Sequence, residues 1–224
     1  MILPRPPSAV VFDMDGLLFD TEALYLEAFL RASEEGGHGL TPAVFMRTIG
    51  GTWPTNQVVL TESYGADFPL DAFRAAWHRH YAVIAQDGVL LKPGALALLD
   101  TLDALGLPRA IATSSRHETA RGHLTAHALT DRFHAVVAQG DYAASKPAPD
   151  PYLLAASRLG VAPSLCLALE DSHNGVRSAF AAGMMTVMVP DLLEATAEIA
   201  ALCTFVATDL HQVRESVLQA HPHR

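Results

Sequence analysis

The stretch that decides the fold is Ala9-Val10-Val11-Phe12-Asp13-Met14-Asp15-Gly16, close to the start of the chain. Its four apolar residues predict a strand that is covered on both faces, as the strands of a parallel sheet are. Two carboxylates follow, and burying such a pair is costly unless a cation neutralises it. Oxygen ligands suit Mg²⁺, and Gly16 permits the sharp turn that comes next. The alternative interpretation is an ordinary Asp-Gly turn that binds nothing.

Further short apolar runs predict more strands, and stretches with helical periodicity lie between most of them. The runs span residues 110–112, 135–138, 165–169, 186–189 and 204–207. The helical stretches span residues 95–105, 118–129, 151–159 and 175–182. Alternating strands and helices predict an α/β fold in which a doubly wound parallel sheet forms a Rossmann-like core.

The alternation is interrupted between the first two predicted strands. Residues 21–88 show helical patterns and no convincing strand, although a crossover between parallel strands needs only a dozen or so residues. We therefore predict a catalytic core that is discontinuous in sequence, made of residues 1–21 and 89–224. Residues 22–88 would form an inserted, all-helical cap domain, with hinges near residues 17–18 and 89–90.

The composition limits the class of protein. Of 224 residues, 50% are hydrophobic and 17% are charged, which excludes intrinsic disorder, and two cysteines exclude a disulfide scaffold. The net charge of −9 argues against a nucleic-acid binder. There is neither an apolar run long enough to span a membrane nor a secretory signal pattern, so we expect a soluble, monomeric, cytoplasmic protein.

Polar residues follow three more predicted strands, and the carboxyl ends of parallel strands meet at one edge of a sheet. The segments are Thr113-Ser114-Ser115, Lys146-Pro147-Ala148-Pro149-Asp150-Pro151 and Glu170-Asp171-Ser172. Lys146 is one of only two lysines, and the prolines after it stiffen the backbone. Two acidic pairs, a fixed lysine and hydroxyl or amide donors at one edge are the groups that phosphoryl transfer requires.

Several of these residues also have a local structural interpretation. Asp20 is suited to be the N-cap of the helix that follows it. Ser115 and Glu118 have the spacing of a capping box, and Asp150 before Pro151 has the pattern of another helix start. Gly183 is expected to end the helix that begins near residue 175.

Taken in order, the four segments resemble the four motifs of the haloacid dehalogenase superfamily. The Asp-Met-Asp-Gly start, the Lys-Pro-Ala-Pro-Asp stretch and the Glu-Asp-Ser-His-Asn-Gly-Val stretch match best. They are similar to the β-phosphoglucomutase-like and pseudouridine-5′-phosphatase-like phosphatases, which carry a helical cap after the first motif. The resemblance runs from about residue 9 to residue 190.

The resemblance implies a reaction that proceeds through an aspartyl phosphate. Asp13 would be the nucleophile, and Asp15 would protonate the leaving oxygen and then deprotonate the attacking water. Lys146 would neutralise the nucleophile and the phosphate. The implied activity is that of a phosphatase acting on a small phosphomonoester, such as a sugar or nucleoside phosphate.

The resemblance also implies the ligands of the site. Mg²⁺ would be the cofactor, held by the Asp13 carboxylate, the backbone carbonyl of Asp15 and Asp171, with Glu170 nearby. Thr113 and the Ser114 amide would hold phosphoryl oxygens, next to the turn at Gly16.

Other reactions of the superfamily fit the sequence less well. Phosphonoacetaldehyde hydrolases use a cap lysine, and residues 21–88 contain none. Haloacid dehalogenases need neither Mg²⁺ nor the second aspartate. Phosphosugar mutases of the β-phosphoglucomutase type have a cap histidine where this chain has Tyr25. They also have an arginine where it reads Gly50-Gly51-Thr52-Trp53, although Arg47 or Arg116 could substitute for that arginine.

We therefore expect a phosphatase, with a phosphosugar mutase as the alternative. A non-catalytic phosphate-binding protein on the same fold is a second alternative, which the presence of Asp13 and Asp15 disfavours. A weaker hypothesis places the cap residues Arg47, Trp53, His78 and Tyr81 around the leaving group.

Overall fold

A wholly parallel sheet forms the centre of the computed structural model, which describes residues 2–222. Within these residues the sheet has six strands in the order β3-β2-β1-β4-β5-β6, so it is doubly wound around β1. The strands are β1 (Ala9–Phe12), β2 (Arg109–Arg116), β3 (Ala135–Gln139), β4 (Cys166–Glu170), β5 (Met185–Met188) and β6 (Phe205–Val206). The predicted Rossmann-like α/β fold is confirmed.

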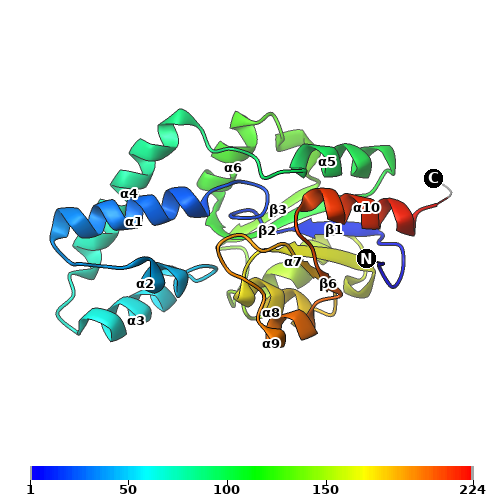
Figure 1. Ribbon diagram of the computed structural model, residues 1–224. Coiled ribbons are helices and arrows are strands. Elements are labelled where there is room, and N and C mark those ends of the chain that lie inside the picture. Colours follow the sequence, from blue (N-terminus) through cyan, green and yellow to red (C-terminus); the bar gives the residue numbers. More distant parts are fainter. Residues whose placement is uncertain (1, 223–224) are drawn as a thin grey trace.

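Helices cover both faces of the sheet (Figure 1). One layer contains α5 (Ala95–Ala104), α6 (His117–Ala126) and α10 (Leu210–Ala220). The other contains α7 (Asp150–Leu159) and α8 (His173–Ala181), with α9 (Ala197–Leu202) beside α8. Alternate residues of β1 face the two layers. Val10 and Phe12 pack with the layer of α5, α6 and α10, whereas Ala9 and Val11 pack with the layer of α7 and α8.

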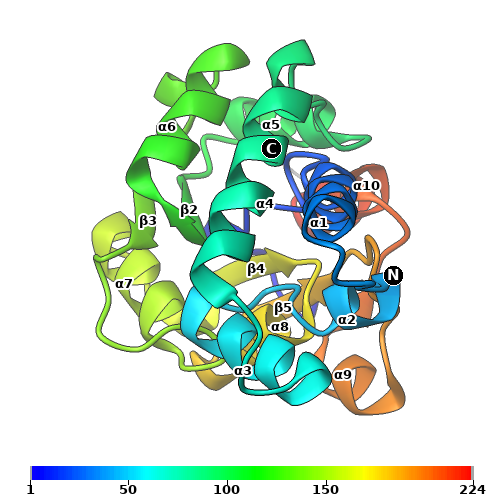
Figure 2. The same cartoon turned by 90° about the vertical axis from the view of Figure 1, so that its left-hand side faces the viewer.

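Four helices lie between β1 and β2 in the sequence and form a separate group in space. They are α1 (Glu22–Gly36), α2 (Pro42–Met46), α3 (Trp53–Tyr64) and α4 (Leu70–Ile84), followed by a short 3₁₀ turn (Ala85–Asp87). We call this group the helical insertion. Its core is built around Phe29, Phe45, Leu60 and Phe73. Figures 1 and 2 show it beyond the carboxyl ends of the strands, with α1 and α4 side by side.

Two short segments connect the helical insertion to the sheet, and they bind each other. The Asp20 amide donates to the Leu90 carbonyl at 2.8 Å, and the Lys92 amide donates to the Leu18 carbonyl at 2.9 Å. A third segment, which follows β5, also contacts the insertion, since Leu192 and Leu193 pack against its apolar core. The insertion is therefore held over the strand ends at more than one place.

Three predicted helix caps, at Asp20, Ser115 and Asp150, are wrong. In each case the side chain binds a group outside the helix. Helix α1 begins at Glu22 after Thr21, because the Asp20 carboxylate binds the Lys92 ammonium at 3.4 Å. Strand β2 continues to Arg116, and Ser115 donates to Asp15 instead of capping α6.

Asp150 is already part of helix α7, and its carboxylate accepts from the Ala144 amide at 3.2 Å. In all three cases a partner outside the helix takes the side chain that was expected to cap it. The predicted end at Gly183 is confirmed: this residue follows α8 with a φ of +76°, a conformation that glycine adopts without strain.

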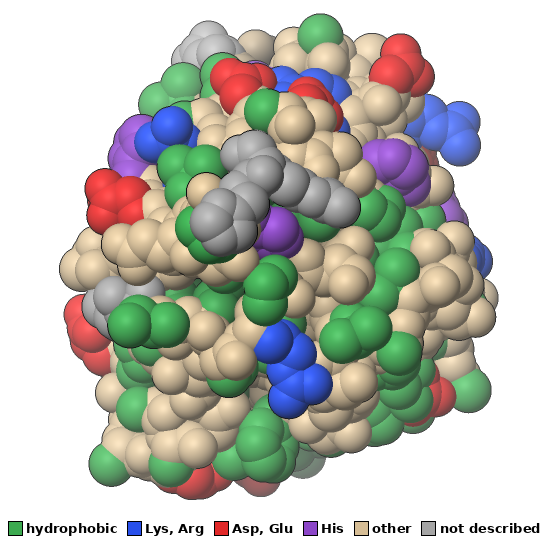
Figure 3. Space-filling view, turned by 90° about the vertical axis from the view of Figure 1, so that its right-hand side faces the viewer, with side chains coloured by type: hydrophobic (Ala, Val, Ile, Leu, Met, Phe, Trp, Pro, Cys, Tyr) green, Lys and Arg blue, Asp and Glu red, His purple; other side chains and the backbone are tan. Residues whose placement is uncertain are grey.

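The opposite end of the molecule is shown in Figure 3, where acidic, basic and apolar side chains are intermixed on the surface. None of the helices within residues 2–222 combines the length and the apolar character that crossing a membrane requires. Most of the buried charged side chains within residues 2–222 lie instead around the carboxyl ends of the strands, whereas buried Arg109 stands at the start of β2 and pairs with Asp103.

Candidate active site

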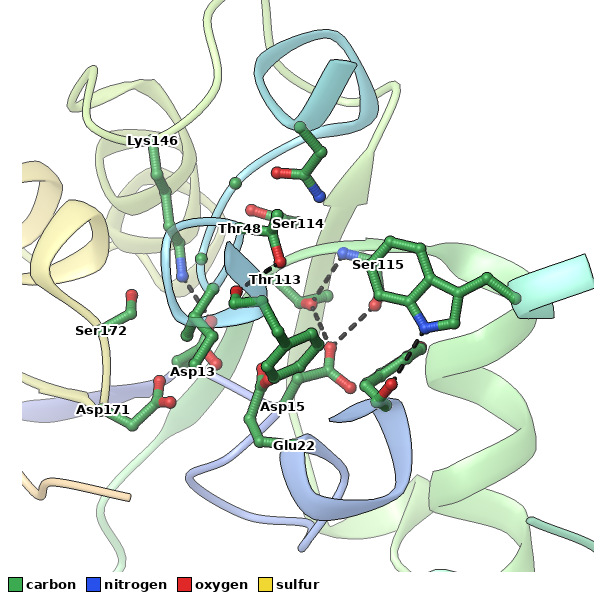
Figure 4. A pocket seen from close by; sticks show the side chains of 17 residues that line it. Asp13, Asp15, Glu22, Thr48, Thr113, Ser114, Ser115, Lys146, Asp171 and Ser172 are labelled. Carbon is green, nitrogen blue, oxygen red and sulfur yellow. Dashed lines mark hydrogen bonds and ion pairs between the residues drawn. The ribbon is translucent and has the colours of Figure 1, made fainter. Parts of the chain in front are cut away.

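The end of β1 places Asp13 and Asp15 at the centre of the site (Figure 4). The Asp13 amide donates to the Leu169 carbonyl at 2.9 Å, so the backbone stays in the sheet while the side chain turns into the cavity. The Asp13 carboxylate is buried and accepts a hydrogen bond from Lys146. Strand pairing thus fixes this carboxylate before any ligand arrives.

Glu170, at the end of β4, holds the Lys146 ammonium group from the other side. The Lys146 Nζ donates to Glu170 Oε1 at 2.5 Å, and the Tyr152 hydroxyl donates to the same oxygen at 2.6 Å. The Ser172 hydroxyl donates to Glu170 Oε2 at 3.1 Å. Because both oxygens already have protein donors, Glu170 is placed to position Lys146.

Burial dominates the electrostatics of these groups. It raises the pKa of Asp13 to about 8, although the adjacent Lys146 acts in the opposite direction. Burial also raises the pKa of Asp171 well above its usual range, and the charge of Asp13 adds to this effect. Burial lowers the pKa of Lys146, but the charges of Asp13 and Glu170 outweigh it, so the pKa is raised and the lysine is charged. The carboxylates still outnumber the lysine, so a further cation would relieve their repulsion.

Three buried carboxylates are close enough to share a metal ion. Asp13, Glu170 and Asp171 each offer an oxygen, and these oxygens lie within 4.8 Å of one another. The Asp171 carboxylate has no hydrogen-bond partner among residues 2–222, so it is available as a ligand. A Cβ at Gly16 would lie 2.3 Å from Asp171 Oδ2, so only glycine lets the turn approach so closely. An all-oxygen set of this kind fits Mg²⁺.

Asp15 faces the polar residues at the end of β2. Its Oδ2 accepts from the Ser115 hydroxyl at 2.7 Å and from the Thr113 hydroxyl at 3.3 Å, while its Oδ1 is buried without a partner. Ser114 lines the same cavity. The sequence analysis missed Ser115 because its spacing to Glu118 suggested a helix cap. Its place directly after Thr113, at a strand end, is the signal that would have found it.

The cavity lies between the strand ends and the helical insertion, with a volume of about 140 Å³. Thr48, Asn56 and Trp77 line it from the insertion side. Glu22, at the start of α1, was also missed by the sequence analysis, and its side chain is buried in the cavity wall. Burial raises the pKa of Glu22 to about 8, and the charge of Asp15 adds to this effect.

A second, outer pocket of about 370 Å³ adjoins the cavity, and Tyr25, Asn56 and Trp77 line both. Of the four cap residues named from the sequence, Trp53, His78 and Tyr81 line this outer pocket. Arg47 lies elsewhere: it forms an exposed ion pair with Glu62 at 2.7 Å and donates to Ser63 at 3.0 Å.

Two arginines, Arg74 and Arg116, line the outer pocket together with one carboxylate, Glu118. The Arg74 guanidinium lies 4.7 Å from the ring centroid of Trp53, and Arg116 comes from the end of β2. Burial lowers the pKa of His78, and the charges of Arg74 and Arg116 lower it further. Tyr25 and Tyr81 stack with ring centroids 4.0 Å apart, and burial raises the pKa of both phenols.

Relatives of known name are similar over most of the chain. Protein CbbY (plasmid) of Cupriavidus necator is 38% identical over 204 residues, covering 84% of this chain and 80% of the relative. The phosphorylated carbohydrates phosphatase of Thermotoga maritima is 32% identical over 176 residues, covering 79% and 82%. The crystal structure of CbbY from Rhodobacter sphaeroides in complex with phosphate superimposes with a TM-score of 0.77 at 25% identity, covering 92% of this chain and 96% of that one.

A family model matches most of the chain. The model of the haloacid dehalogenase-like hydrolases matches residues 7–183, a segment that contains the strand ends with Asp13, Thr113, Lys146 and Asp171. The resemblance found in the sequence is thereby confirmed. The family match, the named relatives and the fold all agree. The chain therefore belongs to the haloacid dehalogenase-like hydrolase family and is an enzyme of that family.

Proposed function

We propose that this enzyme is a Mg²⁺-dependent phosphatase that hydrolyses a small phosphomonoester through an aspartyl phosphate. The observation that carries the proposal is the pairing of the two strand-end aspartates with different partners. Asp13 is bound by Lys146, which favours its ionised form, and Asp15 is bound by the Ser115 and Thr113 hydroxyl groups. Two carboxyl groups in unlike surroundings are suited to unlike roles. The name of the Thermotoga relative supports a phosphorylated carbohydrate as substrate.

The proposed reaction has two steps. An Asp13 oxygen attacks phosphorus, the bond from phosphorus to the leaving oxygen breaks, and Asp15 supplies the proton that the leaving group takes up. Water then attacks the aspartyl phosphate, Asp15 accepts the proton of that water, and inorganic phosphate leaves with Asp13 restored. Lys146 stays paired with Glu170 throughout and offsets the negative charge on Asp13 and the phosphoryl group.

The remaining strand-end residues would hold the ligands. Mg²⁺ would be held by the carboxylates of Asp13 and Asp171 and the backbone carbonyl of Asp15, and it would offset charge on the phosphoryl oxygens. Glu170 is engaged by three protein donors and would act through Lys146. The Thr113 hydroxyl and the Ser114 amide would bind phosphoryl oxygens beside Gly16.

We further propose that residues 22–88 act as a cap on a core made of residues 1–21 and 89–224. The cavity between the two groups of elements supports this division, because residues of both line it. Closing the cap would exclude water while the phosphate is transferred, with hinges near residues 17–18 and 89–90. Identical cap orientation with and without a bound phosphate analogue, in solution scattering, would argue against it.

The test is hydrolysis of p-nitrophenyl phosphate by the wild type and by Asp13→Asn, each with Mg²⁺ and with a chelator. We expect turnover only by the wild type with Mg²⁺, because the variant lacks the nucleophile. Equal rates in the two proteins would refute the mechanism, and equal rates with and without Mg²⁺ would refute the metal requirement.

A phosphosugar mutase is the second candidate function, and the outer pocket is the observation that favours it. A mutase must hold a second phosphate, and Arg74 and Arg116 face this pocket without a carboxylate partner among residues 2–222. Incubation with a hexose 1-phosphate and Mg²⁺, followed by phosphorus NMR, separates the candidates. A mutase yields hexose 6-phosphate, whereas a phosphatase yields inorganic phosphate.

A further inference from the structure

The end of β2 that lines the cavity leaves the regular ladder of the sheet. Strand β2 pairs with β3 up to Ala112 and again at Arg116, and residues 113–115 form an irregular stretch between these two pairs. On its other side, β2 pairs with β1 only as far as Ile111 among residues 2–222. The peptides of residues 113–115 can therefore turn toward a ligand, but the ladder does not fix their direction. Another contact must fix it.

The hydroxyl group of Tyr142 makes such a contact. Tyr142 follows β3, and its hydroxyl donates to the Thr113 carbonyl at 3.1 Å. Burial raises the pKa of this phenol, so the hydroxyl keeps its proton and remains a donor. The Tyr142 ring packs against the apolar cluster that contains Val137 and Ala155, and a phenylalanine ring would pack there in the same way. The packing of the ring therefore does not explain the hydroxyl group.

A single peptide unit links this contact to the candidate active site. The Thr113 carbonyl and the Ser114 amide belong to the same peptide, which is trans, so they point in opposite directions. Tyr142 follows β3, whereas Asp13 and Asp15 follow β1, which lies on the other side of β2 in the sheet. A Thr113 carbonyl that faces Tyr142 therefore turns the Ser114 N–H toward the two aspartates.

Neighbouring donors of the same stretch are already engaged. The Ser115 amide donates to the Thr113 hydroxyl at 3.0 Å, and the hydroxyl groups of Thr113 and Ser115 both donate to Asp15. This leaves the Ser114 amide as the backbone donor that a phosphoryl oxygen would use. A carbonyl that accepts a hydrogen bond also polarises its peptide, so the bond from Tyr142 should make the Ser114 N–H a stronger donor.

The turn in front of Tyr142 holds this residue in place. Asp141 Oδ2 accepts from the Ala138 amide at 3.2 Å and from Arg158 of α7 at 3.0 Å, and it pairs with His117 of α6 at 3.0 Å. Burial acts to raise the pKa of Asp141, but the hydrogen bonds of His117 and Arg158 outweigh it and lower the pKa to about 2. The Asp141 carboxylate is therefore charged, and it anchors the turn to both helices.

We propose that Tyr142 is a positioning residue for phosphoryl transfer. Its hydroxyl group holds the peptide between Thr113 and Ser114 in the orientation in which the Ser114 amide donates to a phosphoryl oxygen. This inference rests on the proposed function, which assigns the Ser114 amide to that oxygen. Tyr142 itself contacts no reacting atom, so its effect on the reaction passes through this one peptide.

The first experiment observes this peptide directly by NMR. The chain contains one Thr-Ser dipeptide, so labelling threonine carbonyls with ¹³C and serine amides with ¹⁵N leaves a single HNCO signal, that of Thr113 and Ser114. The probe is tungstate, an oxyanion that mimics phosphate, added to saturation with Mg²⁺. In the wild type the Ser114 amide proton should move downfield as it donates to the oxyanion. In Tyr142→Phe the Thr113 carbonyl signal should move upfield before tungstate is added, and the amide proton should respond less to tungstate.

Kinetics and calorimetry measure the consequence of the change. Removing an oxyanion donor outright costs about 10²- to 10³-fold in kcat, and a misaligned donor loses part of that, so Tyr142→Phe should lower kcat for p-nitrophenyl phosphate by about tenfold. The KM should change by less than about threefold, because the interaction matters most in the transition state. Tungstate should bind the variant about fivefold more weakly, which is the net effect of one hydrogen bond.

The matched control is Tyr64→Phe, which also removes one phenolic hydroxyl group. Tyr64 lies in α3, its ring packs against Phe68, and it lines neither the cavity nor the outer pocket. This variant should match the wild type in kcat, in tungstate affinity and in the response of the Ser114 signal.

The outcomes separate this inference from the proposed function. If either kcat or the tungstate affinity of Tyr142→Phe stays within about twofold of the wild type, the inference is overturned. It is also overturned if both fall while the Ser114 amide responds to tungstate as in the wild type, because the losses then arise elsewhere in the fold. If the wild type hydrolyses no phosphomonoester but the Ser114 response and the tungstate affinity weaken in the variant, the proposed reaction fails and the role of Tyr142 stands. If turnover occurs but the wild-type Ser114 signal ignores tungstate, the reaction stands and the role of Tyr142 is refuted.

Discussion

The two lysines of this chain occupy similar local settings and perform different tasks. Each precedes a proline, as Lys92-Pro93 and Lys146-Pro147, and each bridges two carboxylates. Lys146 lies between Asp13 and Glu170 at the strand ends. Lys92 lies between Asp191 at 2.7 Å and Asp20 at 3.4 Å, where the helical insertion joins the sheet.

The difference between the two bridges is burial. The Lys146 side chain is 2% exposed and its partners are 9% and 0% exposed, whereas Lys92 is 20% exposed and its partners Asp191 and Asp20 are 11% and 42% exposed. Water and salt screen the Lys92 bridge, so its energy is small and it mainly joins segments of the chain. Around Lys146 the charges are little screened, so in the proposed mechanism they would set the reactivity of Asp13. The same arrangement of one lysine and two carboxylates thus has a proposed chemical role in one place and joins segments of the chain in the other.

The largest expected difference concerns activity. Replacing either lysine by methionine keeps an apolar stem of similar length and removes the charge. Lys146→Met should lower kcat/KM for phosphomonoester hydrolysis by about 10³-fold, because a charge that faces the transferring phosphoryl group is lost. Lys92→Met should lower it by less than about tenfold, because this lysine touches neither Asp13 nor Asp15. Steady-state kinetics with Mg²⁺ measures both, and losses of equal size would contradict the distinction.

The next difference concerns stability without metal. Lys146→Met leaves Asp13 and Glu170 buried without their cation, which should lower the free energy of unfolding by about 3 kcal/mol. Lys92→Met leaves Asp191, 11% exposed, and Asp20, 42% exposed, without their cation, and because Lys92 is itself nearer to water it should lower the free energy of unfolding by less, about 1–2 kcal/mol. Urea unfolding in the presence of a chelator compares the two variants with the wild type. The ranking would be wrong if Lys92→Met proved the less stable variant.

The smallest expected effect concerns pH. Burial raises the pKa of Asp13 to about 8 and raises that of Asp171, so the folded protein keeps protons that the unfolded chain releases near pH 4. Without metal, stability should therefore fall as the pH rises from about 4 to about 8. Burial lowers the pKa of Lys92, but the Asp191 carboxylate outweighs it and the net shift is upward, so this bridge contributes equally across that window.

Mg²⁺ replaces those protons, so its stabilising effect should be larger at pH 8 than at pH 5. We expect a difference of at least about 1 kcal/mol, or roughly 2–4 °C in Tm for a chain of this size. Calorimetry of the wild type and Lys92→Met, with and without Mg²⁺ at the two pH values, tests this. Both proteins should show the same pH effect, and a Mg²⁺ effect independent of pH would exclude the Asp13 cluster as its source.

Much of the fold could be predicted because it depends on local patterns. A run such as residues 9–12 is a buried strand wherever it lies, since four apolar side chains require cover on both faces. Residues 21–88 show helical patterns and no strand pattern, which likewise predicted helices, and the structure places α1 to α4 there. The four strand-end motifs meet at one edge because parallel strands share their direction, so Asp13, Thr113, Lys146 and Asp171 line one cavity.

The partners of the polar side chains could not be predicted in this way. Asp20, Ser115 and Asp150 have sequences typical of helix caps, but each binds a group elsewhere in the fold. Glu170 lies in the carboxylate group that could hold a metal, but its hydrogen bonds with Lys146, Tyr152 and Ser172 could not be predicted from the sequence. Glu22 has no signal beyond an acid at a helix start, and only the folded chain buries it in the cavity.

The amino-acid sequence by itself determined the sheet, the edge where the chemistry lies and the family. Apolar periodicity and motif order are properties of neighbouring residues, so they survive without coordinates. Only the tertiary structure decided that Lys146 is buried between Asp13 and Glu170 while Lys92 stays near water. Burial and pairing depend on which distant segments approach each other, and the local sequence of the two Lys-Pro dipeptides does not determine this.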